Sequence, residues 1–167
     1  FGEAGQNGSD CNSIPVFFNN SITHPLGPYG MLAPFFDDLD DNEGVEPFNV
    51  YFWTNEQNSA IVEWDNIANG QHDEDCEIGV LDSCPRHTFQ LILDGANGGN
   101  GEIIFQYHNV TNWKTVEDSS ELWYVDDHGS TIGIESPDKN TGTQYLFNLS
   151  DQDALLLHNE LAVKFSD

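Results

Sequence analysis

The sequence predicts an all-β protein, an antiparallel β-sandwich of jelly-roll-like type with little or no helix. Short apolar segments with period-two alternation recur along the chain, and clusters of Gly, Asn and Asp separate them. No βαβ rhythm is present. With 167 residues, the chain is long enough for one domain with a sizeable core and short for two. We therefore expect a single β-sandwich domain over residues 1–167.

The predicted strands are rich in β-branched and aromatic residues. In the fourth, Ile61, Glu63 and Asp65 share one face, and Val62 and Trp64 take the other. The predicted strands cover residues 14–18, 31–36, 48–53, 59–67, 87–93, 102–107, 130–135, 143–147 and 161–165.

Three connections stand out between these segments. Residues 94–101 (DGANGGNG) predict a flexible hairpin connection. Residues 68–86 form an acidic insertion between two strands that would otherwise make a hairpin. Residues 151–160 fit either a short helix with Asp151 near its cap or a single turn.

The net charge of −25 comes from 29 acidic residues against 4 basic ones. Such a surface repels phosphate backbones and anionic lipid, which argues against nucleic acid and membrane-surface partners. No apolar run reaches the length of a membrane span, so no membrane insertion is expected. The chain starts at Phe1 without a leader pattern; we expect either that a leader was removed or that a larger precursor was cut.

The cysteines indicate an oxidising compartment. Cys76 and Cys84 lie eight positions apart in a polar stretch and predict a small disulfide loop, as in secreted or cell-surface proteins. Cys11 is left over, and it is either free or paired with a segment outside this sequence. No CxxC pair is present, which disfavours a cysteine-based zinc site.

The sharpest local motif is a D-x-D-x-N-x-G arrangement that follows an apolar strand. Alternate oxygens on a tight loop converge on one point, as a hard cation requires, so we predict a structural calcium ion here. It is not an EF-hand, because the glycine comes one place late and Asn49 stands where a bidentate glutamate belongs. The alternative is a solvated acidic loop. The candidate ligands are Asp37, Asp38, Asp40, Asp41, Asn42 and Glu43.

Catalytic motifs are sparse. The six histidines form no HExxH or HxH pair, which disfavours a zinc hydrolase, and no G-x-S-x-G elbow is present. Carboxylate pairs for glycoside hydrolysis stay open, because acidic pairs occur throughout the chain.

The four tryptophans divide into two groups. Trp53 and Trp64 lie inside strand patterns and are predicted to be core residues. Trp113 and Trp123 flank a polar stretch, and with Tyr124 they are the predicted ligand-binding aromatics. Exposed rings beside polar groups commonly stack on the apolar face of a pyranose.

The order of the motifs resembles an accessory β-domain of large secreted bacterial proteins. These include gingipain-like and subtilisin-like peptidases and surface proteins with sorting tails. The resemblance covers most of residues 14–165. It rests on residues 25–28 (PLGP), 31–39 (MLAPFFDDL), 50–52 (VYF), 61–66 (IVEWDN), 88–93 (TFQLIL), 101–107 (GEIIFQY), 131–135 (TIGIE), 144–145 (QY) and 161–165 (LAVKF).

This resemblance implies an extracellular, non-catalytic sandwich module beside a protease or an adhesin. Such domains usually begin with further strands and an Asn-Gly turn, where this chain has only residues 1–13 before the first match. Either the fold is trimmed, or the missing strands come from another segment or chain. A sandwich without its first strands exposes an unpaired edge, which is a site for strand addition.

We therefore expect a non-catalytic extracellular accessory module, stabilised by calcium, that binds protein or glycan. The alternative is a self-assembling cell-surface or filament subunit that uses strand addition. A carboxylate-based glycoside hydrolase is the third hypothesis.

Overall fold

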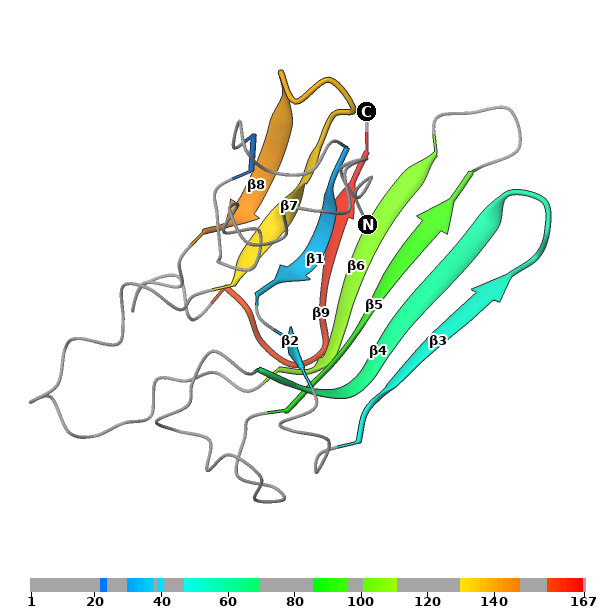
Figure 1. Ribbon diagram of the computed structural model, residues 1–167. Coiled ribbons are helices and arrows are strands. Elements are labelled where there is room, and N and C mark those ends of the chain that lie inside the picture. The colour runs from blue at the N-terminus through cyan, green and yellow to red at the C-terminus, as the bar shows by residue number, and fades with distance from the viewer. Residues whose placement is uncertain are drawn as a thin grey trace, which may run out of the picture. The chain divides into compact units, whose positions relative to one another are not determined.

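A computed structural model describes residues 22–23, 30–37, 39–40, 47–69, 86–95, 101–110, 130–147 and 156–166. Within these residues every regular element is a β-strand, and every strand pairing is antiparallel. The strands form one three-stranded and one six-stranded sheet, so the predicted all-β class with the two antiparallel sheets of a β-sandwich is confirmed (Figure 1). The described residues contain no helix that could span a membrane.

The chain divides into two compact units, and each sheet belongs to one of them. The larger unit comprises Leu39–Val116 and Ala154–Asp167, and the smaller comprises Phe1–Asp38 and Glu117–Asp153.

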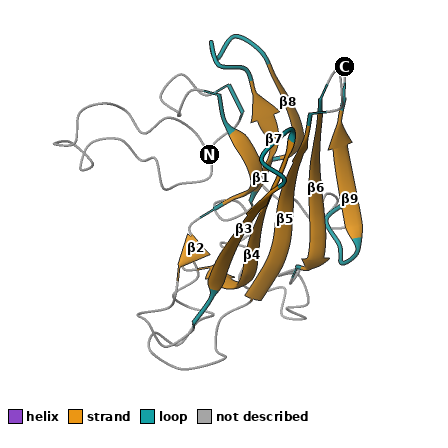
Figure 2. Cartoon of the chain, turned by 90° about the vertical axis from the view of Figure 1, so that its right-hand side faces the viewer, coloured by secondary structure: helices purple, strands orange, loops and turns teal. Residues whose placement is uncertain are grey.

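The six-stranded sheet has β4 near one edge and β9 at the other. The strand order is β4-β5-β6-β9, and both β2 and β3 pair with β4 along the side that β5 leaves free (Figures 1 and 2). The strands are β2 (Leu39–Asp40), β3 (Asn49–Thr54), β4 (Ser59–Asn69), β5 (Arg86–Asp94), β6 (Glu102–Asn109) and β9 (Leu161–Phe165).

One face of this sheet carries the core of the larger unit. Phe89 lies between Trp64 and Tyr107, with ring centroids 5.0 and 6.4 Å away. Next along the face, Phe105 meets the edge of Phe165 at 5.1 Å. Phe89, Phe105 and Tyr107 are almost fully buried, and burial stabilises each by roughly 1.5–3 kcal/mol. Val62 is buried on the same face as Trp64, whereas Ile61, Glu63 and Asp65 are not, so the alternation predicted for residues 61–65 is confirmed.

A β-bulge in β4 keeps that alternation in phase. The pairing with β5 shifts between Trp64 and Ile67, and Asn66 takes a left-handed φ of 61° that asparagine tolerates better than most residues. Thr88 Oγ1 accepts the Asn66 N–H at 3.0 Å, and Arg86 donates to the Asn66 carbonyl at 2.6 Å. The extra residue returns Ile67 to the core face, where only 4% of it is exposed.

The three-stranded sheet has the order β1-β7-β8 and comprises β1 (Leu32–Phe36), β7 (Thr131–Glu135) and β8 (Gly142–Leu146). Ile22 packs with Met31, Ala33 and Phe36 in its core cluster. Gly133 makes room for this packing, because a Cβ there would lie 2.5 Å from the Thr143 carbonyl oxygen and 2.8 Å from the Ile22 side chain.

The predicted strands agree well with the observed ones. Each predicted strand except 14–18, which lies outside the described residues, coincides with an observed strand to within two residues at either end. Strand β2 was not predicted, since two residues are too few for an alternation. Residues 156–160 form turns and no helix. β4 and β5 do pair as a hairpin around the acidic insertion, although its predicted ends, 68–69 and 86, belong to the strands.

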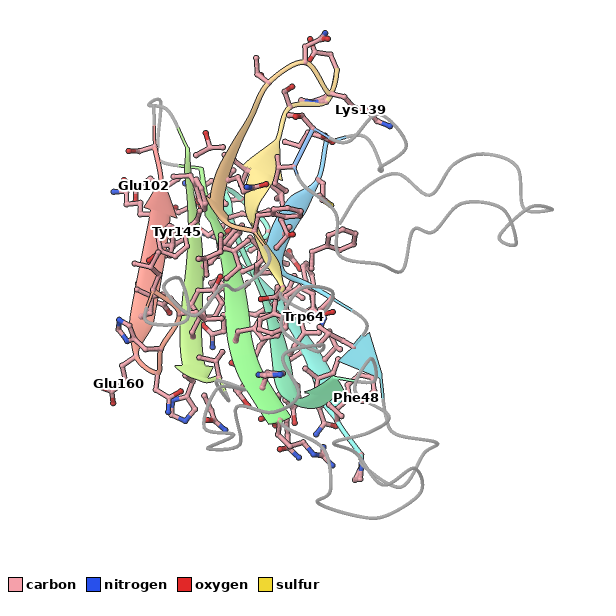
Figure 3. The ribbon with its side chains drawn as sticks, turned by 90° about the vertical axis from the view of Figure 1, so that its left-hand side faces the viewer. Phe48, Trp64, Glu102, Lys139, Tyr145 and Glu160 are labelled. Carbon is pink, nitrogen blue, oxygen red and sulfur yellow. The ribbon has the colours of Figure 1, made fainter. Side chains whose placement is uncertain are left out.

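The turn between β7 and β8 is organised by Asp138. Its Oδ1 accepts the Ser136 hydroxyl at 2.6 Å and the Asn140 N–H at 3.1 Å, and its Oδ2 accepts the Asn140 side-chain amide at 2.9 Å. These bonds, chiefly that from Ser136, lower the pKa of Asp138 from 3.8 to about 2. Lys139 follows with a φ of 60° at the tip of the hairpin (Figure 3).

We predict that Asp138 makes this hairpin acid-sensitive. A carboxyl whose pKa is lowered by folding stabilises the fold above its unfolded pKa, and the effect is lost as the pH falls through the folded pKa. The wild type should therefore lose thermal stability relative to Asp138→Asn between about pH 4 and pH 2. Parallel pH profiles of the two melting temperatures would show that Asp138 has no such role.

Candidate binding site

Strand β3 exposes four consecutive large apolar residues. The exposed fractions are 50% for Val50, 53% for Tyr51, 69% for Phe52 and 54% for Trp53. The prediction that Trp53 is a core residue was therefore wrong, because among the described strands β3 lies at the edge of its sheet and pairs with β4 alone. Trp64, one strand further in, is half-buried. A group of large apolar side chains that stays exposed to water in the folded protein is typical of an interaction surface.

The register assigns these side chains to two opposite faces. Trp53 lies opposite Ile61, and Tyr51 lies opposite Glu63. Val50 and Phe52 lie opposite Trp64 and Val62 on the other face, the one that carries the core. Consecutive strand residues point to opposite sides, so Tyr51 and Trp53 stand together with their Cα atoms about 7 Å apart.

A row of polar side chains continues from Tyr51 across the sheet. Glu63 pairs in register with Gln90, and Gln90 with Gln106. The Gln90 amide donates a hydrogen bond to the Glu63 carboxylate, and Gln106 is exposed. We call the surface formed by Tyr51, Trp53, Glu63, Gln90 and Gln106 the aromatic face.

Beside the polar row runs an apolar one. Trp53, Ile61, Ile92 and Ile104 succeed one another in register from β3 to β6. The isoleucines are half-buried and continue the apolar row from the indole. The aromatic face thus offers two rings and a row of carboxylate and amide groups, and the isoleucine row runs beside it on the same side of the sheet. This combination suits a ligand that is itself amphipathic.

The turn between β3 and β4 holds the aromatic strand in place. Asn55 Oδ1 accepts three backbone N–H groups, from Gln57 and Asn58 at 3.0 Å and from Ser59 at 2.9 Å. Asn58 and Gly95 are joined by two further hydrogen bonds, at 2.6 and 2.7 Å, which tie the turn to the end of β5. A ligand that binds to β3 therefore meets a surface that is already ordered.

Most residues that the sequence marked as candidates lie outside the described part of the chain. They are Asp38, Asp41, Asn42 and Glu43 of the calcium loop, the aromatic residues Trp113, Trp123 and Tyr124, and the cysteines Cys76 and Cys84. The calcium, glycan and disulfide assignments for them stay predictions.

Two calcium candidates do lie in the described residues. Asp37 follows β1 and is half-buried, and Asp40 lies in β2 with its backbone opposite Ala68. The boundary between the two units falls between Asp38 and Leu39, inside the predicted calcium loop. Among the described residues, no three His, Cys, Asp or Glu side chains converge as metal ligands would.

Among the described strands, Asp94 and Glu102 are the only two acidic residues directly opposite each other. Each has its own partner: Ser59 Oγ donates to Asp94 at 3.0 Å, and Lys164 forms an ion pair with Glu102. Figure 3 places Glu102 at one end of the sheet. Two like charges directly opposite each other on neighbouring strands are destabilising, and these partners offset the repulsion between the two carboxylates.

No protein-family model matches the chain, and no curated protein or solved structure matches it. The resemblance to accessory domains of secreted bacterial proteins thus rests on the order of sequence motifs alone.

We predict that Asn55 is the main stabiliser of the β3–β4 turn. Asn55→Ala removes the acceptor of three N–H groups at an exposed turn, where water replaces it only in part. It should lower the free energy of unfolding by about 1 kcal/mol in thermal or urea denaturation. Asn55→Asp is the matched control, because a carboxylate oxygen accepts the same three bonds. Equal losses in the two variants would contradict this role of Oδ1.

Proposed function

We propose that the chain is a non-catalytic, extracellular accessory module that binds a glycan on its aromatic face. The observation that carries the proposal is that Tyr51 and Trp53 stand side by side on one face, both more than half exposed, at the head of a row of carboxylate and amide groups. A pyranose has an apolar face that stacks on aromatic rings and hydroxyls that bond to carboxylates and amides.

Three features support a glycan as the ligand. The turn at Asn55 orders the strand that carries both rings, which lowers the entropic cost of binding. The polar row comes from three neighbouring strands, so it extends across the sheet and can contact several units of a sugar chain. The net charge of −25 disfavours sulfated or otherwise anionic polysaccharides. We therefore expect a neutral or cationic glycan.

The extracellular setting in this proposal has separate support. It rests on the predicted loop between Cys76 and Cys84 and on the resemblance to domains of secreted bacterial proteins. The resemblance also supports the absence of catalysis.

We predict that Trp53→Ala and Tyr51→Ala each weaken glycan binding by roughly tenfold or more, equivalent to about 1.4 kcal/mol. The ligand is first found on a microarray of neutral and cationic glycans. Affinity for a soluble oligosaccharide is then measured by tryptophan fluorescence. Calorimetry is used for Trp53→Ala, because that variant lacks the tryptophan at the site. Both measurements are made at low protein concentration.

Phe52→Ala is the matched control, since it removes an even more exposed ring from the same strand but from the opposite face. It should bind the glycan like the wild type. The proposal fails if the wild type binds no neutral or cationic glycan, or if Phe52→Ala weakens binding as much as Trp53→Ala does.

We also propose that calcium binds the loop that contains Asp38, Asp40 and Asn42. The proposal rests on the D-x-D-x-N-x-G spacing, whose alternate side-chain oxygens match what a hard cation requires. Calcium at about 100 times its Kd should add about 2.7 kcal/mol of stability, equivalent to a rise of roughly 5–10 °C in melting temperature over the EDTA-treated chain. Asp40→Asn should abolish most of this rise, and Asp138→Asn should keep it. An identical melting temperature with and without calcium rejects the site.

A further inference from the structure

The free edge of β3 is unprotected. Among the described residues β3 pairs only with β4 and has no strand along its other side. Edge strands usually resist pairing through a charge or a proline. Edge strand β9 carries Lys164 and edge strand β1 carries Pro34, whereas β3 and edge strand β8 carry neither a charge nor a proline. Of these two strands, only β3 exposes large apolar side chains.

The hydrogen bonds of the two hairpins show which backbone groups face this edge. Asn55 N–H bonds to the Ser59 carbonyl, and Gly95 N–H bonds to the Asn58 carbonyl. Bonded and non-bonded pairs alternate along an antiparallel ladder. Counted back from the bonded pair of Asn55 and Ser59, the N–H and C=O groups of Trp53 and Tyr51 point toward β4. The bond between Gly95 and Asn58 gives the same result, because it fixes which residues of β4 bond to β5. The N–H and C=O groups of Val50, Phe52 and Thr54 therefore point away from β4.

These outward groups are arranged symmetrically about Phe52. If a second β3 lies antiparallel with the two Phe52 residues opposite each other, Val50 meets Thr54 of the second copy and Thr54 meets Val50. Every outward N–H and C=O of one strand then has a partner on the other. The same register places Tyr51 opposite Trp53 of the second copy, an aromatic cross-strand pair of the kind that stabilises sheets.

We propose that two copies of this chain associate through β3 in this antiparallel register, so that their six-stranded sheets become one continuous sheet. The two aromatic faces then adjoin, and their four rings form two neighbouring cross-strand pairs of Tyr51 and Trp53. The proposal goes beyond glycan binding and stands without it, since it rests on the backbone of β3 and on Phe52, which lies on the opposite face.

Charge and area set the expected strength. In this register the two Glu63 carboxylates, the acidic groups nearest the junction on the aromatic face, lie about 16 Å apart, beyond the Debye length of about 8 Å at physiological ionic strength. The total charge of −25 on each copy still opposes association at low salt. The three half-exposed rings offer roughly 300 Å² per copy, so the interface is small and the dimer should be weak.

The test is sedimentation velocity and equilibrium on the wild-type chain at rising concentration, in about 0.05 M and about 0.5 M sodium chloride. We expect a dimer whose fraction rises with concentration and with salt. Phe52→Lys places two cations face to face at the symmetry axis and should raise the dimer Kd at least about tenfold. Val50→Lys serves if Phe52→Lys does not fold, as judged by circular dichroism.

The matched control is Phe147→Lys, the same substitution at an exposed residue of the smaller unit. It should dimerise like the wild type. A wild type that stays monomeric up to about 1 mM at high salt overturns the proposal, since even weak complexes have Kd values near this limit. So does a dimer that survives Phe52→Lys, or one that Phe147→Lys weakens equally.

Crosslinking tests the register. Opposite Phe52 residues have Cα atoms about 5.5 Å apart, within the disulfide range, whereas the two Trp53 residues are about 8 Å apart. Oxidised Phe52→Cys should therefore form a symmetric crosslink between copies and Trp53→Cys should not. Peptide mass mapping separates this bond from any that the three native cysteines form. The opposite result would exclude the register.

Discussion

The pairing of β3 with β4 is the interaction on which the exposed surface of the larger sheet depends. Their turn fixes the hydrogen-bond phase, because the Asn55 and Ser59 backbones are bonded to each other and the Asn55 side chain accepts three further N–H groups. In that phase, the N–H and C=O groups of Tyr51 and Trp53 point toward β4, and their side chains lie on the aromatic face. The same phase leaves the backbone of Val50 and Phe52 facing the open edge.

The rest of the larger sheet supplies the stability that the exposed side chains of β3 do not. Phe89, Phe105 and Tyr107 are buried on one face, and the bulge at Asn66 keeps Ile67 on that face instead of turning it toward solvent. A strand such as β3 would be marginal as part of an isolated hairpin, but pairing with β4 in a wider sheet gives it support. Its exposed rings therefore add little to the core and are free to contact a ligand.

The strands could be predicted from the sequence because alternation is a local property, as Ile61, Val62, Glu63 and Trp64 show. The position of a strand within its sheet is not local, and for that reason Trp53 was assigned to the core. Both tryptophans lie in apolar strand patterns, but among the described strands Trp64 has a neighbour on both sides and Trp53 on one. The sequence of residues 49–54 did contain a signal, because it carries no charge and places large apolar groups on both faces of the strand. Such a pattern is typical either of a strand whose two faces are both covered or of an edge strand that binds a partner.

The aromatic face could not be predicted because it depends on register. Glu63, Gln90 and Gln106 are far apart in the sequence and meet only when β4, β5 and β6 pair with the observed offsets. The bulge near Asn66 was equally hidden, since nothing in the alternation of 59–67 shows where an extra residue is inserted. The sequence-derived calcium and disulfide sites are of the opposite kind: they rest on local motifs and lie largely outside the described residues.

The central claim is that β3 is an ordered strand with one edge open, and amide hydrogen exchange measured residue by residue tests it most directly. In dilute chain, the amides of Tyr51 and Trp53 should be protected through their bonds to β4, and those of Val50 and Phe52 should exchange rapidly. Protection of Val50 and Phe52 at the level of their neighbours in dilute solution would mean that another segment covers the edge, and would contradict this account.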